Sequence, residues 1–116
     1  MAENTMKVYQ KWEDMSEYMY ICLKSYPKSE RFTLAADTSK TLWRIGVNIT
    51  RANSIGNAKK EEKRRSIEAA DYALVELKVL VRMGMKLKFL SIKKYEIMSG
   101  LITEVGKMIG GWLKTF

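Results

Sequence analysis

The sequence predicts an all-α protein, an antiparallel up-and-down four-helix bundle. Apolar residues recur three and four positions apart in four separate segments, which is the periodicity of a helix that buries one face. No stretch of the sequence shows the competing period of two that is typical of strands. The links between the segments are short, and short links favour antiparallel neighbours.

The first two helices are expected on either side of Pro27, which disfavours helix at the residue before it. Ser29 or Thr33 is suited to cap the second helix. The apolar seam of the first helix is Val8, Trp12, Met15, Met19, Cys22 and Tyr26. The seam of the second is Ala35, Thr38, Leu42, Ile45, Ile49 and Ala52. Trp12 and Trp43 have core or near-core spacing, so we expect both to serve packing.

The third helix follows the break "NSIGN", where Asn57 is suited to cap it, and Ser91 is suited to cap the fourth. The seam of the third helix is Ile67, Ala70, Leu74, Leu77, Val81 and Gly84. The seam of the fourth is Tyr95, Met98, Ile102, Val105, Ile109 and Trp112.

The length of 116 residues suits one domain, residues 1–116. Cys22 is the single cysteine, which excludes a disulfide within the chain and fits a reducing compartment. No apolar run approaches the roughly 18 residues that span a bilayer. The N-terminus is polar and of mixed charge, unlike a signal peptide. We therefore expect a soluble, cytoplasmic protein without a membrane partner.

Catalytic groups are scarce. The chain has no histidine, the commonest general base, and with one cysteine a zinc site is not expected. Cys22 lies on an apolar seam, and Glu61 and Glu62 lie in a charged helix start. The phosphate-loop spacing G-x-x-x-x-G-K-[ST] is missing. We predict a non-enzymatic protein with no catalytic residue, no metal and no cofactor.

The net charge of +8 is unevenly distributed, since residues 78–116 hold eight basic and only two acidic residues. Such an excess points to nucleic acid, an anionic membrane or an acidic protein. Three basic residues of the third helix are spaced four apart, and three of the second, including Lys40, share a face. Two more occupy the first turn of the fourth helix, where the helix dipole disfavours cations. The contacts we predict are Lys78, Arg82, Lys86, Lys93, Lys94, Arg44 and Arg51.

These residues predict contacts to phosphates that tolerate any base sequence and weaken with salt. The alternative is an ordinary solvated surface. Binding to a membrane surface is less favoured, because the apolar faces are committed to packing.

The fourth helix has more apolar surface than one core seam needs. Ile97, Leu101 and Met108 lie beside the seam, which favours a second buried face and hence an oligomer. The alternative is that they widen the contact inside one bundle.

The double glycine of "GKMIGGW" precedes Trp112 near the end of the chain. We expect Gly110 or Gly111 to stop the helix in the left-handed conformation of a C-terminal cap. Trp112 would then pack back on its own bundle or on a neighbouring subunit. Gly110, Gly111 and Trp112 are thus predicted to serve packing in the oligomer.

Several segments together resemble the accessory variability determinant (Avd) proteins of diversity-generating retroelements. They are "YPKSERFTLAADTSKTLWRIGVNITRA", "ALVELKVLVRMGMKLKFLS" and "VGKMIGGWLK", and the resemblance covers roughly residues 26–114. The terminal motif G-[KR]-M-[IL]-G-G-W is the most specific part, and Arg82 matches an arginine of the third helix. Ala35 and Gly84 depart from the pattern, and Gly84 is expected to loosen its helix or permit a close crossing.

This resemblance implies a basic, homopentameric barrel of four-helix bundles that binds RNA or DNA and the reverse transcriptase of the retroelement. The complex makes mutagenised cDNA from template RNA, and the Avd protein is not its polymerase. The shorter motif "PKSERFTL" is also similar to four-helix proteins of ribosomal RNA intervening sequences. An interaction protein of that type, without a polymerase partner, is therefore the alternative. A nuclease is a weaker third class, because the sequence offers no cluster of metal ligands.

Overall fold

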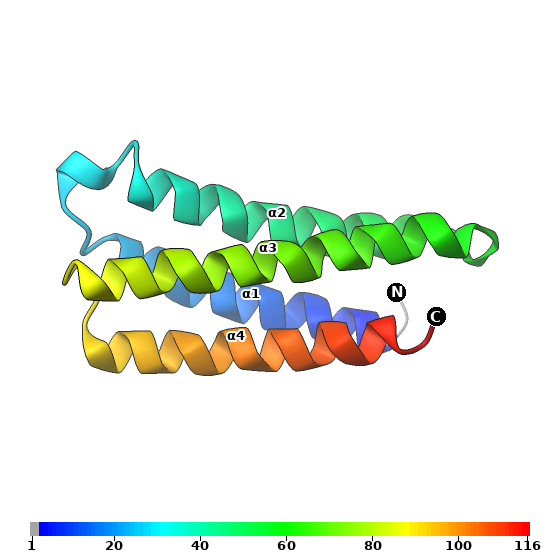
Figure 1. Ribbon diagram of the computed structural model, residues 1–116. Helices are drawn as coiled ribbons and strands as arrows, with labels where there is room; N and C mark the ends of the chain where they lie inside the picture. The colour runs from blue at the N-terminus through cyan, green and yellow to red at the C-terminus, as the bar shows by residue number, and fades with distance from the viewer. Residues whose placement is uncertain (1–2) are drawn as a thin grey trace.

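The computed structural model describes residues 3–116, with side chains from Lys7 onward. In this part of the chain the structure has four α-helices and no strand. They are α1 (Glu3–Leu23), α2 (Leu34–Ser54), α3 (Lys60–Lys86) and α4 (Ile92–Leu113), with short 3₁₀ turns at Lys28–Glu30 and Asn57–Lys59. Each helix runs antiparallel to the one before it (Figure 1). The predicted all-α four-helix bundle is confirmed.

The helices follow one another around the bundle. Consecutive helices pack together, and α4 closes the ring against α1. The pairs α1/α3 and α2/α4 are therefore diagonal, and Figure 1 shows α3 in front of α1. This order gives the surface four grooves, one between each pair of neighbouring helices.

The core consists of the seams that the periodicity predicted. Every seam residue named for α1 and α3 is buried, and only Ala35 of α2 and Tyr95 of α4 are partly exposed. Trp43 differs from expectation, because it is 55% exposed although its ring lies 5.8 Å from that of Trp12. It packs beside the core and leaves much of its indole accessible.

Two aromatic rings of the α1 segment lie directly against glycines of other helices. The indole of Trp12 covers Gly46 of α2, and its Nε1 donates to the carbonyl oxygen of Leu42 at 2.8 Å. The phenol of Tyr26, just beyond α1, lies against Gly84 of α3. A β-carbon at either glycine would overlap a ring. Gly84 thus permits a close approach, one of the two expectations for this position.

The Tyr26 hydroxyl is buried and has no hydrogen-bond partner among the described residues. Burial raises the pKa of Tyr26 to about 12, so the phenol is neutral at physiological pH. An unpaired buried hydroxyl opposes folding by about 1–3 kcal/mol.

The helix starts are capped differently from one another. Ser91 caps α4 as predicted, since its Oγ accepts from the Lys94 backbone N–H at 3.2 Å. Thr33 stands before α2, but its hydroxyl donates to Glu30 Oε1 at 2.8 Å and makes no cap bond. Asn57 begins a 3₁₀ turn instead of capping α3.

α3 ends in a tight reversal centred on Lys88, whose φ of 65° is left-handed. The Phe89 N–H donates to Gly84 O at 2.9 Å and the Lys88 N–H to Met85 O at 3.0 Å. This is the Schellman pattern that normally uses glycine. Ser25 Oγ also donates to Phe89 O at 3.2 Å, which ties this loop to the α1–α2 connection.

The predicted helix stop at the double glycine is wrong. α4 continues to Leu113, and no glycine among the described residues has a positive φ. The helix continues because Ile109 and Trp112 remain buried on the core seam. Its last carbonyls are satisfied further on, where Thr115 Oγ1 donates to Trp112 O at 2.6 Å. A β-carbon at Gly110 or Gly111 would meet nothing within 4 Å.

The extra apolar residues of α4 are explained in part within the bundle. Leu101 and Met108 are partly buried against its core. Ile97 remains 43% exposed. The intramolecular alternative therefore accounts for two of the three residues.

Gly84→Ala should destabilise the bundle by about 1–3 kcal/mol, the usual cost of overpacking a close contact. The matched control is Gly100→Ala, also inside a helix but with open space around the new β-carbon. It should gain about 1 kcal/mol from helix propensity. Tyr26→Phe removes the hydroxyl oxygen, which is the atom closest to a β-carbon at position 84. The double variant Tyr26→Phe/Gly84→Ala should therefore be more stable than Gly84→Ala alone. Urea denaturation measures the stability of the three variants and of the unmodified protein, and equal stability of Gly84→Ala and Gly100→Ala would contradict the close contact.

Candidate nucleic-acid interface

α3 separates two grooves on the surface of the bundle. The α2/α3 groove encloses about 330 Å³ and is lined by Asp37, Lys40, Thr41, Arg44, Glu76, Val79 and Leu80. The α3/α4 groove encloses about 280 Å³ and is lined by Lys78, Val79, Val81, Arg82, Tyr95, Ser99, Ile102 and Thr103. Val79 lines both grooves, so it stands on the ridge between them.

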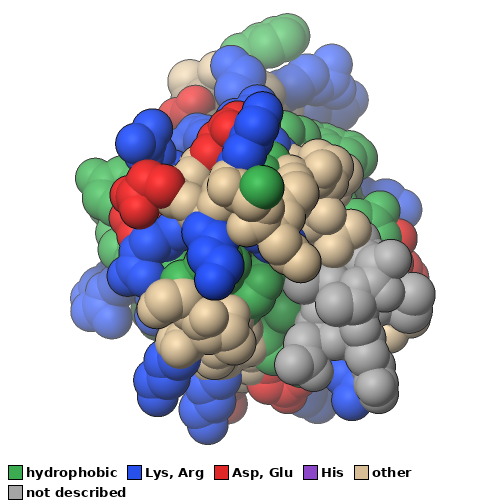
Figure 2. All heavy atoms as spheres, turned by 90° about the vertical axis from the view of Figure 1, so that its right-hand side faces the viewer, with side chains coloured by type: hydrophobic (Ala, Val, Ile, Leu, Met, Phe, Trp, Pro, Cys, Tyr) green, Lys and Arg blue, Asp and Glu red, His purple; other side chains and the backbone are tan. Residues whose placement is uncertain are grey.

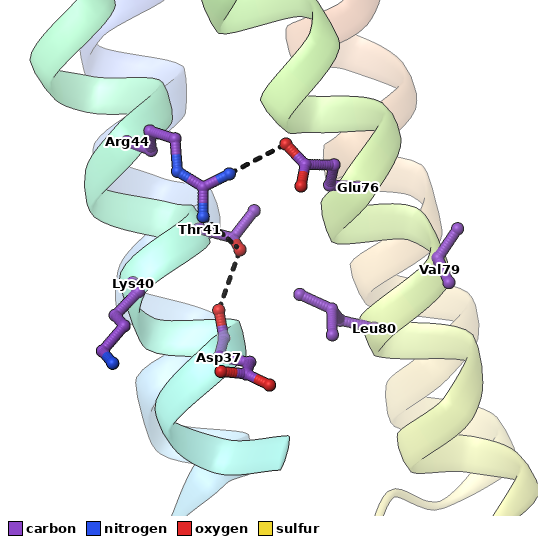
Figure 3. A pocket seen from close by; sticks show the side chains of 7 residues that line it. All are labelled: Asp37, Lys40, Thr41, Arg44, Glu76, Val79 and Leu80. Carbon is purple, nitrogen blue, oxygen red and sulfur yellow. Dashed lines mark hydrogen bonds and ion pairs between the residues drawn. The ribbon is translucent and has the colours of Figure 1, made fainter. Parts of the chain in front are cut away.

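The α2/α3 groove is electrically balanced. Its two basic residues, Lys40 and Arg44, face two acidic ones, Asp37 and Glu76. Figure 3 shows the Arg44 guanidinium reaching across the groove to the Glu76 carboxylate, and the Nη1–Oε1 distance is 2.8 Å. The charge of Arg44 is therefore already compensated within the chain.

The α3/α4 groove has two cations and, among its described lining residues, no acid. Lys78 and Arg82 are exposed on α3 and make no ion pair within the described part of the chain. Tyr95 and Ser99 place hydroxyl groups on the opposite wall, where the Thr103 hydroxyl donates to the Ser99 carbonyl oxygen at 2.9 Å. Cations beside hydroxyl donors suit the oxygens of a phosphodiester.

The other predicted contacts lie apart from this groove. Lys86 is exposed in the last turn of α3. Lys93 and Lys94 lie in the first turn of α4, which contains no acid, as the dipole argument required. Lys94 is half-buried and Lys93 is exposed. Arg51 is in the last turn of α2. The seven residues therefore divide among several faces.

The hydroxyl residues that α4 contributes to the α3/α4 groove were not among the predicted contacts. Tyr95, Ser99 and Thr103 are spaced four apart, so they form one stripe along the helix. That spacing was visible in the sequence. The stripe was not recognised because Tyr95 also belongs to the apolar seam.

Basic residues of the α1–α2 connection were also missed. Lys24, Lys28 and Arg31 line a hollow at the end of the bundle where α3 ends and α4 begins. Figure 2 shows the opposite end, where lysine and arginine side chains are spread over the surface with acidic side chains among them. Basic side chains are therefore present at both ends of the bundle as well as in the α3/α4 groove.

Exposed apolar residues form a second feature of α3, which we call the α3 ridge. Tyr72 and Val79 are 70% and 63% exposed, and Val75 and Met83 are close to half exposed. Their spacing of three and four places them on the outer face of the helix. Such a stripe of apolar surface typically marks an interaction site.

Side chains of the kinds that carry catalysis do not cluster in the described part of the chain. Cys22 is buried, and burial raises the pKa of its thiol while the charge of Lys94 offsets this only partly. Residues 3–116 include no group of three or more histidine, cysteine or acidic side chains placed to hold a metal. None of their helices has the length and apolar character to cross a bilayer.

Fold and surface together define a basic four-helix bundle with a cationic groove. The chain matches the model of the bAvd-like family over residues 6–116 and belongs to that family. The suspected Avd resemblance is thereby confirmed, and the family is of the accessory type. A search of curated proteins gave no match.

Cys22 should resist thiol reagents at neutral pH in the folded protein. Its raised pKa leaves little thiolate, the reactive form, and its burial blocks access. The rate of labelling by a disulfide reagent should be far lower in buffer than in urea. Equal rates in the two conditions would contradict its placement in the core.

Proposed function

We propose that this protein is a non-enzymatic accessory subunit of a diversity-generating retroelement. It acts as a basic homo-oligomer, a pentamer by family resemblance. It binds template RNA or cDNA together with the reverse transcriptase of the retroelement, and so supports mutagenic retrohoming.

The observation that carries nucleic-acid binding is the charge of the α3/α4 groove. Lys78 and Arg82 lack acidic partners there, whereas Arg44 of the adjacent groove is paired with Glu76. An unpaired cation gains more from a phosphate, because no internal ion pair has to be broken. The bAvd-like family supports the retroelement context.

Self-association is supported by the α3 ridge and by Ile97 of α4. Both leave apolar side chains exposed in the single chain, and burial of such surface against another copy is favourable by about 25 cal/mol per Å². The polymerase partner is supported by family membership.

The partner is tested by co-purification with the reverse transcriptase of the retroelement, followed by a native mass measurement of the free protein. We expect capture of the polymerase and a multiple of the chain mass. A stable monomer that captures no polymerase would instead favour the intervening-sequence type of interaction protein.

Replacement of Lys78, Arg82 and Lys86 by alanine should weaken binding to single-stranded RNA. Each lost phosphate contact lowers the slope of log affinity against log salt by about 0.7. The triple variant should therefore be less salt-dependent by a slope of about 2. Fluorescence anisotropy over a salt series measures both quantities.

The matched control is the triple alanine variant of Lys40, Arg44 and Arg51 on α2, which removes the same charge. A smaller effect is expected there, because Arg44 is engaged by Glu76. If the α3 variant kept its salt slope, or if the two variants lost affinity equally, the α3/α4 groove would not be the principal contact.

Gly110→Ala/Gly111→Ala should weaken assembly without harming the single chain. Both positions have open space within the protomer, so the helix itself should gain about 1 kcal/mol per substitution. Native mass spectrometry and thermal unfolding separate the two effects, with Gly100→Ala as the control. Unchanged assembly of the double variant would show that the glycines do not contact another subunit.

A further inference from the structure

The α1/α2 groove lies on the side of the bundle away from the α3/α4 groove, and its chemistry is different. It encloses about 290 Å³ and is lined by Tyr9, Trp12, Glu13, Ser16, Glu17, Tyr20, Leu42 and Trp43. Four of these residues are aromatic and two are acidic. Since the whole chain has a net charge of +8, an acidic aromatic groove is a local exception.

The exposed aromatic residues of this groove are held in place. Trp43 Nε1 donates to the Tyr20 hydroxyl at 2.7 Å, and that hydroxyl also lies 2.7 Å from Ser39 Oγ. The Trp43 ring is 5.8 Å from Trp12, which forms a buried floor. An indole that is 55% exposed yet fixed by a hydrogen bond is preorganised to contact a partner.

The carboxylates of the groove are uncompensated. Glu13 and Glu17 lie one helical turn apart on α1, where like charges repel. Neither has a cationic partner among the described residues.

Ser16, on the same wall, is buried. Its side chain is only 8% exposed, and its Oγ has no hydrogen-bond partner among the described residues. Among the described residues, the groove thus contains two carboxylates without an ion pair beside an aromatic surface.

We propose that the α1/α2 groove docks an arginine- or lysine-bearing amphipathic helix of a protein partner. The cation stacks on the exposed face of Trp43 and is bound by Glu13 and Glu17, while the apolar side of the helix covers Tyr9 and Tyr20. Nucleic acid is excluded from this groove because its phosphates are repelled by the two carboxylates. This assignment rests on the function proposed above, in which the protein partner is the reverse transcriptase.

The arrangement allows both ligands to bind at once. α1 is diagonal to α3 in the bundle, so a helix bound between α1 and α2 leaves Lys78 and Arg82 accessible. The polymerase and its template would then be held on different sides of the same subunit.

The test compares three variants in co-expression with the reverse transcriptase. Glu13→Gln/Glu17→Gln removes the charge but keeps the shape, and Trp43→Ala removes the aromatic surface. Glu61→Gln/Glu62→Gln is the matched control, since it neutralises two exposed carboxylates at the start of α3. Capture of the polymerase, native mass and RNA affinity are measured for each, with thermal unfolding to verify folding.

We expect both groove variants to lower polymerase capture at least about tenfold, as loss of a central interface contact does. The control should match the unmodified protein, and all variants should keep their native mass and RNA affinity. Normal capture by the Glu13→Gln/Glu17→Gln variant would overturn the proposal. A reduced native mass would overturn it too, because the groove would then hold a second copy of the chain. If the unmodified protein captured no polymerase, the proposed function would fail along with this occupant.

Discussion

The close seating of two aromatic rings on two glycines fixes how α1 meets the rest of the bundle. Trp12 lies on Gly46 of α2, and Tyr26 lies on Gly84 of α3. Each contact tolerates no β-carbon, so the segment cannot slide along its neighbours without expelling a large ring from the core. The hydrogen bond from Trp12 to Leu42 O adds a directional restraint. The register of the α1 segment against α2 and α3, and with it the composition of the α1/α2 groove, depends on these contacts.

The charge of each groove depends on which side chains its two helices bring together, and three of the grooves differ clearly in charge. Arg44 meets Glu76 across the α2/α3 groove, at a sequence separation of 32 residues, and the two charges cancel. Lys78 and Arg82 meet hydroxyl groups instead, so their charge remains available. Glu13 and Glu17 meet aromatic rings, so theirs remains available with the opposite sign. One bundle therefore presents a face suited to phosphates and a face suited to cations.

Much of the fold was predictable, because helical periodicity records which face of each helix is buried. The sequence also predicted Lys78 and Arg82 as contacts, because their spacing of four is a local property. What it could not give were the pairings between helices, such as Arg44 with Glu76. The predicted helix end at the double glycine was wrong for a related reason. Local preference favoured a helix end, but burial of Ile109 and Trp112 on the core outweighs the helix cost of two glycines, about 1 kcal/mol each. The exposure of Trp43 was not predicted, because near-core spacing does not distinguish a residue buried at the bottom of a groove from one exposed at its edge.

We propose that the α3/α4 groove, and not the adjacent α2/α3 groove, binds the nucleic acid. Lysine footprinting of the complex with a single-stranded RNA at low salt distinguishes the two grooves. Acylation of each lysine would be quantified by mass spectrometry with and without RNA. We predict strong protection of Lys78 and little protection of Lys40, which lines the adjacent groove. A fully reactive Lys78, or equal protection of Lys40, would contradict the assignment.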